Sequence, residues 1–251
     1  MTPMARRIFI LLICSLLLSC TKEEKALPTY TIDVIAGKEG TKALGLDGSG
    51  ALKATWAEGE EVKVIKAGDG TLLGTLTAQS SGPNTKLSGT ITGDISVGNT
   101  LSLDFLSSNY TSQDGTLSGN NTSIDKVCDY ATAAVKVTAI SGSSVTTEAA
   151  TFKNMQAIVK FSLKHGDAVL PAEEMTVTVS GYTSGGPSSI KISVRPKTLT
   201  SELYVAIPCY YNGDQPLNFS LQVWSQGVLF SKDVASVKLY NGKYYHITVT
   251  L

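Results

Sequence analysis

Apolar and polar residues alternate with a period of two along most of the chain after residue 28. In the first such segment, residues 30–36, the apolar side chains fall on one face. These are Tyr30, Ile32, Val34 and Ala36. The same alternation recurs at 61–66, 101–105, 134–138, 158–163, 175–179, 190–194 and 217–224. Because the side chains of a strand point alternately to its two faces, this period predicts half-buried β-strands. Gly-, Ser- and Asn-rich turns separate them and no 11-residue window favours a helix, so we expect an all-β protein of sandwich type.

The C-terminal segment predicts a β-hairpin. Asn241-Gly242 suits a two-residue type I′ turn, in which both positions take positive φ. The turn would join a strand near 233–240 to a last strand at 243–251. The apolar face of that last strand would hold Tyr245, Ile247, Val249 and Leu251.

Two polar stretches interrupt the pattern and bear on domain organisation. Residues 107–130 are rich in Asn, Ser and Thr and predict a long loop, and residues 141–151 form a second Ser/Thr/Gly stretch. We place a domain boundary near residue 150, which gives β-sandwich domains at 29–150 and 151–251, each of ordinary domain size. A single large sandwich remains the alternative.

The first nineteen residues predict a signal peptide. Arg6 and Arg7 precede an apolar run that is too short to span a bilayer, and Cys20 follows a small residue at its end. This arrangement resembles the lipobox of bacterial lipoproteins, which implies cleavage before Cys20 and acyl chains on that residue. Residues 20–28 would then be a lipidated tether, since two or more acyl chains hold a protein stably on a membrane. The alternative is an ordinary signal peptide with an incidental cysteine.

Charge and cysteine content narrow the function classes. The 251 residues carry 21 Lys and Arg against 21 Asp and Glu, a balance that argues against a nucleic-acid partner. The 42% hydrophobic content argues against disorder. After processing and acylation, Cys128 and Cys209 remain. An oxidising compartment would permit a disulfide between them, but we expect two separate buried thiols.

The chain contains few residues in arrangements that suggest catalysis or metal binding. The two histidines, His165 and His246, have no second ligand at metal-binding spacing, and no nucleophile elbow, phosphate-binding loop or dinucleotide motif occurs. We therefore expect no enzyme, cofactor or metal site. Aromatic side chains could stack on sugars, although strand aromatics more often pack in cores. The candidates are Trp56, Tyr210, Tyr211, Trp224, Tyr244 and Tyr245.

The order of several motifs resembles the fimbrillin-like lipoproteins of Bacteroidetes, which are subunits of surface pili and related adhesins. The motifs are the lipobox, Gly40-Thr41-Lys42-Ala43, and the segments 56–64, 74–77, 87–91, 151–161 and 241–249. The resemblance implies two tandem transthyretin-like Greek-key β-sandwich domains after the signal peptide. It also implies export to the outer surface of the outer membrane, with the acyl chains on Cys20 as the anchor.

The same resemblance implies assembly by strand exchange. A protease would cut after a basic residue, here Lys42, and remove the first strand. A C-terminal strand of another subunit, here the segment ending at Leu251, would fill the groove. The family more often has Arg at the cut, whereas Arg195 is the only Arg of the mature chain. The chain also ends directly after its last predicted strand, which is either a core strand or the donor. If it is a core strand, the protein would accept a strand without donating one, which suits a tip or accessory subunit and equally a family member that never polymerises.

These features predict a surface lipoprotein that acts in cell adhesion or as a tip or accessory subunit of a pilus. Its partners would be other pilus subunits and a ligand on a host or microbial surface. The alternative is a glycan-binding outer-membrane lipoprotein of a carbohydrate-uptake system, for which exposed aromatics should gather on one surface.

Overall fold

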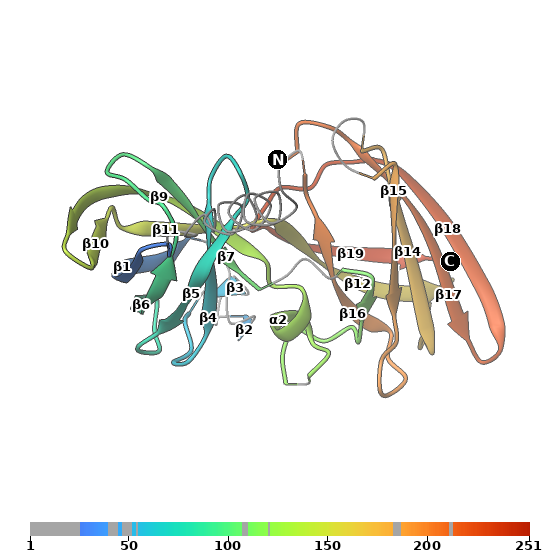
Figure 1. Cartoon of the computed structure of the whole chain (residues 1–251). Helices are drawn as coiled ribbons and strands as arrows, with labels where there is room; N and C mark the ends of the chain where they lie inside the picture. The colour runs from blue at the N-terminus through green and yellow to red at the C-terminus, as the bar shows by residue number, and fades with distance from the viewer. Residues whose placement is uncertain are drawn as a thin grey trace, which may run out of the picture.

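The computed structural model describes residues 26–39, 45–46, 52–53, 55–106, 110–119, 121–182, 187–210 and 213–251. Within these ranges nearly all regular structure is β-strand, and the single helix described, α2 (Ile124–Val127), has four residues. The prediction of an all-β protein is confirmed. Figure 1 shows the strands gathered in two groups, one from each half of the chain. The signal peptide, Cys20 and Lys42 lie outside the described residues.

The N-terminal group is an eight-stranded sheet that closes on itself. Its strands are β1 (Thr29–Glu39), β4 (Glu61–Lys66), β5 (Leu72–Ala78), β6 (Asn84–Thr92), β7 (Thr100–Phe105), β9 (Ala131–Ser141), β10 (Ser144–Thr147) and β11 (Ala150–Asn154). The order is β10-β1-β11-β9-β7-β4-β5-β6, and β1 also pairs with β6. The inward faces enclose one apolar core, in which Trp56 packs edge-on against Phe105 and Phe152 at centroid distances of 5.6 Å and 5.1 Å. Beside this sheet, β2 (Gly45–Leu46) pairs with β3 (Leu52–Lys53).

The C-terminal group consists of two sheets around a second core. In one sheet, β12 (Gln156–His165) lies between β16 (Glu202–Pro208) and β19 (Tyr244–Thr250), and β13 (Ala168–Val169) pairs with its end. The other has the order β18-β17-β14-β15-β8. Its strands are β8 (Ser112–Gln113), β14 (Glu174–Ser180), β15 (Ser189–Val194), β17 (Leu217–Ser225) and β18 (Val228–Val237). Alternate residues of both sheets are buried in one cluster, as the period of two predicts.

The predicted hairpin at Asn241-Gly242 is wrong. The strand β18 pairs with β17, whereas β19 runs parallel to β12 in the other sheet. The four residues 240–243 do form a turn, closed by the Lys243 N–H donating to the Tyr240 carbonyl at 3.2 Å. Gly242 takes a φ of +68° but Asn241 has no positive φ, so the turn is not type I′. Buried Leu239 anchors the connection as it crosses between the sheets.

The polar stretch 107–130, predicted as a loop, contains β8 and α2 and packs between the two groups of strands. Tyr110, Ile124 and Cys128 form a small apolar cluster with Ile158 and Ala206 of the second group. The sequence predicts a loop here because the few apolar residues of the segment show no period. No helix in the described part of the chain is long and apolar enough to span a bilayer.

Gln113 joins this segment to β16. Its side-chain amide donates to the carbonyls of Tyr110 (3.0 Å) and Ala206 (2.9 Å), and its amide oxygen accepts from the Ala206 N–H (2.9 Å). The side chain is buried. The amide therefore does for Ala206 what a neighbouring strand would do, and β16 keeps its backbone groups satisfied at that edge.

Replacing Gln113 with Leu should destabilise the protein. The substitution leaves both the N–H and the carbonyl of Ala206 without this partner, which costs about 2–6 kcal/mol at 1–3 kcal/mol for each buried group. Chemical denaturation measures the loss. Gln79→Leu, on the exposed side of the chain after β5, is the matched control and should change stability by less than about 0.5 kcal/mol. Equal effects of the two substitutions would contradict the role of Gln113.

Candidate functional site

The strand β1 closes the N-terminal sheet by pairing on both of its edges. On one edge, residues 29–37 pair antiparallel with 84–92 of β6. On the other, residues 31–33 and 36–39 pair in parallel with β10 and β11. β1 is the first of the described strands, so no described strand precedes it along the chain and would have to leave with it. Its removal would open the sheet without breaking any other strand pairing.

The inward face of β1 fills the first core. Ile32, Val34 and Ala36 are each 2% exposed or less, and Tyr30 is half-buried against the same cluster. Complete burial of an Ile or Val side chain contributes roughly 1.5–3 kcal/mol. Without β1 the sheet would therefore expose an apolar groove flanked by unpaired backbone groups.

Lys38 fixes the C-terminal end of β1 inside the protein. Its side chain is 2% exposed and its ammonium lies 3.0 Å from Glu60 Oε2. The ammonium also donates to the Thr55 carbonyl at 3.3 Å and lies 3.4 Å from the centroid of the Trp56 ring. Cation–π attraction strengthens when the cation is withdrawn from water, as it is here. Lys38 thus links β1 to the segment that leads into β4.

On the outer face, Asp33 links β1 to β6. Ser88 Oγ donates to one carboxylate oxygen at 2.6 Å and Lys86 Nζ lies 3.2 Å from the other. The Ser88 hydrogen bond, with the charge and hydrogen bond of Lys86, lowers the pKa of Asp33 below its usual value. Because all three groups are exposed, this cluster sets register more than it adds stability.

The seam between β1 and β10 is the weaker edge. Pairing there changes partner from β10 to β11 between Asp33 and Ala36, whereas pairing to β6 is continuous. A cavity of about 270 Å³ opens along this seam, lined by Thr31, Ile32 and Asp33 and by residues 144–146. A departing β1 would therefore separate first from β10.

The four predicted residues of the last strand lie together on one side of β19. Val249 is buried, and Tyr245, Ile247 and Leu251 are half-buried against the second core. Among the described strands, β19 pairs only with β12, along one edge. It is therefore held less completely than β1.

Sequence reasoning missed a likeness between β1 and β19. In β1 the inward series is Tyr30, Ile32, Val34, Ala36, and in β19 it is Tyr245, Ile247, Val249, Leu251. The first three residue types coincide at the same spacing. A comparison of the apolar faces of the predicted strands would have found it. The two strands thus present nearly the same apolar face to a core.

The aromatic candidates for sugar binding do not gather on one surface. Trp56 lies in the first core, whereas Trp224 is 44% exposed on β17. Tyr210, 51% exposed, packs edge-on against Tyr182, and Tyr211 lies outside the described residues. Tyr244 and Tyr245 occupy opposite faces of β19.

The remaining reactive side chains serve packing and hydrogen bonding. Cys128 and Cys209 are buried thiols that are not joined by a disulfide, as expected. Burial raises the pKa of each thiol to about 12, so neither is a nucleophile near neutral pH. His165 Nδ1 lies 2.8 Å from the Leu251 carbonyl oxygen and His246 Nε2 lies 2.8 Å from Ser162 Oγ. Within the described ranges no group of three metal-ligating residues occurs.

Comparison with known proteins gives similar solved structures. No protein-family model and no curated protein matches the chain. A fimbrial protein from Bacteroides ovatus is 13% identical with a TM-score of 0.42; the match covers 90% of this chain and 49% of the other, so this chain spans about half its length. A candidate cell adhesion protein from the same species is 16% identical, with 90% and 94% covered and a TM-score of 0.46. A candidate polysaccharide-binding protein from Bacteroides thetaiotaomicron is 11% identical, with 88% and 92% covered and a TM-score of 0.43.

Replacing Lys38 with Met should loosen β1. The substitution keeps the apolar stem but removes the ammonium from Glu60 and Trp56. Loss of one partner of a largely buried ion pair costs up to 3–5 kcal/mol, and the 24% exposure of Glu60 lowers this to about 2 kcal/mol. Hydrogen exchange of β1 amides and denaturant unfolding measure the effect. Lys63→Met, on the exposed face of β4, is the control. Unchanged exchange in β1 would contradict the anchoring role.

Proposed function

We propose that this protein is a surface-anchored lipoprotein that acts in cell adhesion as a tip or accessory subunit of a pilus assembled by β-strand exchange. The observation that carries the proposal is the place of β1, which closes the first sheet and can leave it without disturbing any other pairing. Anchoring would come from acyl chains on Cys20 and would place the protein at the outer membrane, facing outward.

Removal of β1 would create an acceptor groove. The backbone of residues 84–92 would lose its partner on one side and β10 and β11 would lose theirs on the other. Unpaired backbone groups and exposed apolar pockets are both costly in water. An extended strand from another subunit would satisfy the backbone by β-augmentation, and its alternate side chains would fill the pockets.

The burial of Lys38 bears on where a protease would cut. Of the two lysines at the end of β1, Lys38 is 2% exposed and held by Glu60. A protease cannot reach a lysine enclosed in this way. Lys42, four residues further along, therefore remains our proposed cleavage site, and cleavage there would release all of β1.

Of the two roles that the sequence leaves open for the last strand, core strand or donor, we propose that β19 can serve as a donor. Its apolar series would place Tyr245, Ile247 and Val249 where β1 places Tyr30, Ile32 and Val34. In its own sheet Ile247 is half-buried and β19 pairs along one edge, whereas the groove would bury Ile247 fully and pair both edges. The move would therefore increase the apolar burial and backbone pairing of β19 itself, while β12 would lose its partner on one edge and the second core would lose Val249. Leu251 on the site of Ala36 is the one larger residue to be accommodated.

The arrangement of the sheets supports a division into two transthyretin-like sandwich domains. The first sheet ends with β11 at Asn154 and the second group of strands begins with β12 at Gln156. We therefore move the proposed boundary from residue 150 to Met155. The segment around α2 precedes this boundary in the chain but packs against strands of the second domain.

Replacing Lys42 with Gln should block maturation. In cell envelopes, mass spectrometry should find the wild-type N-terminus at Ala43 and the N-terminus of the variant at acylated Cys20. Lys53→Gln changes the next lysine of the same connection and should leave processing unchanged. An N-terminus at Ala43 in the Lys42→Gln variant would count against cleavage at this site.

Peptide rescue should identify the strand that fits the groove. Protein cleaved after Lys42 and freed of β1 is mixed with a peptide of residues 243–251, a Val249→Asp version of it, or a peptide of residues 29–39. A peptide at 100 times its Kd adds about 2.7 kcal/mol, which raises Tm by roughly 5–10 °C in a chain of this size.

We expect the 29–39 and 243–251 peptides to raise Tm and the Val249→Asp peptide to leave it unchanged. If only the 29–39 peptide raised Tm, the groove would still be a strand acceptor, but the proposal that β19 is its donor would be rejected. Rescue by neither peptide would overturn strand exchange at this groove.

A further inference from the structure

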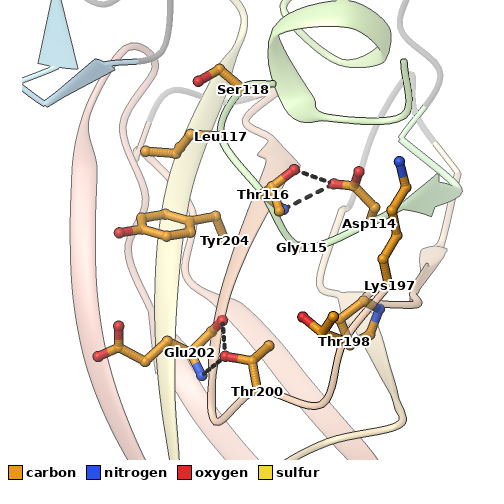
Figure 2. A pocket seen from close by; sticks show the side chains of 11 residues that line it. Asp114, Gly115, Thr116, Leu117, Ser118, Lys197, Thr198, Thr200, Glu202 and Tyr204 are labelled. Atoms are coloured by element: carbon orange, nitrogen blue, oxygen red, sulfur yellow. Dashed lines mark hydrogen bonds between the residues drawn. The ribbon is translucent and has the colours of Figure 1, made fainter. Parts of the chain in front are cut away.

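A cleft of about 490 Å³ lies in the C-terminal group, between the segment after β8 and the loop that leads into β16. Figure 2 shows Leu117 and Tyr204 along one side and Thr116, Lys197 and Thr198 along the other, with Glu202 at one end. Its volume is within the range of small-ligand sites. None of these residues belongs to β1 or β19, although Tyr204 lies beside Tyr244 of β19.

Tyr204 and Leu117 give the cleft an apolar side. Tyr204 is half-buried on β16, and its N–H donates to the Gly115 carbonyl at 2.9 Å, which holds the strand beside the segment after β8. A tyrosine ring offers a flat apolar face with a polar hydroxyl at its rim. The C–H faces of sugar rings pack on such surfaces while their hydroxyls point to the sides.

The remaining lining residues of the cleft are polar and carry charges of both signs. Glu202, with a side chain 53% exposed, lies 2.8 Å from Lys160 Nζ. The hydrogen bond to Glu202 raises the pKa of Lys160, so the ammonium stays charged at neutral pH. The carboxylate of Glu202 can accept hydrogen bonds from hydroxyls in the cleft. Lys197 and the buried Asp114 also line it, so charges of both signs surround a ligand there.

The loop over the cleft is rigid before any ligand arrives. Asp114 is 4% exposed, and its carboxylate accepts from the Thr116 N–H (2.9 Å), Thr116 Oγ1 (2.6 Å) and Thr122 Oγ1 (2.9 Å). These bonds fix Thr116 at the rim. Preorganisation lowers the cost of binding.

We propose that this cleft binds a neutral saccharide. Tyr204 packs on the face of a sugar ring, and Glu202, Thr116 and Thr198 hydrogen-bond to its hydroxyls. The cleft gives the proposed adhesive role a ligand class, and in that respect it rests on the proposed function.

The test uses the full mature protein and a panel of neutral gluco-, galacto- and manno-configured oligosaccharides of four to six sugars, with sialylated and sulfated glycans alongside. Calorimetric titration of the best binder then compares variants. Tyr204→Leu should weaken binding at least tenfold, Glu202→Gln should weaken it severalfold, and Tyr204→Phe should retain most of it. Trp224→Ala removes an exposed aromatic outside the cleft and should change nothing. Thermal melts confirm that each variant is folded.

The proposal is overturned if no neutral oligosaccharide binds, if only the anionic glycans bind, or if Tyr204→Leu binds as well as the wild type. Peptide rescue of the β1 groove is measured on the same variants. Loss of sugar binding with intact rescue is the expected pattern for Tyr204→Leu. Wild-type rescue without any sugar binding would reject the cleft alone, and sugar binding without rescue would reject strand exchange alone.

Discussion

The pairing of β1 on both edges is the constraint on which the first half of the structure depends. Residues 84–92 obtain their backbone partners from it on one side, and β10 and β11 do so on the other. Its alternate side chains complete the core around Trp56. Backbone hydrogen bonds are the same for any sequence. The position of β1 therefore selects among strands only through the few core pockets that its inward side chains fill. An element so central can therefore be exchanged for another strand that presents a similar face.

In the proposed assembly, Lys38 would make that exchange depend on cleavage of the chain. When the apolar series of β1 and β19 are matched, residues 245–251 take positions 30–36. No residue of this matched series takes the position of Lys38. A strand with the pattern of β19 therefore fills the pockets but does not supply the ammonium that Glu60 and Trp56 receive from β1. While β1 is covalently attached it also has a high effective concentration. Both effects favour retention of β1 until the chain is cut.

The sequence allowed the strands to be predicted, but not their neighbours. Segments such as 61–66 and 217–224 show the period of two because one face is buried whatever strand lies beside it. The pairing of β19 with β12 joins residues some 85 positions apart, and the local preference of Asn241-Gly242 says nothing about it. Lys38 continues the inward face of Ile32, Val34 and Ala36. From the sequence alone, however, a lysine at this position predicts that the buried part of the strand has ended. Its partners, Glu60 and Trp56, lie about twenty residues away and become visible only in the fold.

The saccharide cleft could not be predicted for the same reason, since Leu117 and Tyr204 come from segments almost ninety residues apart. Its place in the sheet matters for how the two proposed activities combine. Ile158 of β12 pairs with Ala206 of β16 on one edge and with Tyr244 of β19 on the other. The cleft is therefore built on the edge of β12 opposite to β19. Transfer of β19 to a neighbouring subunit would leave the β12–β16 pairing, the Gly115–Tyr204 bond and the Lys160–Glu202 pair in place, but it would remove Tyr244, which lies beside Tyr204. The two proposed activities would therefore meet at the contact between Tyr204 and Tyr244.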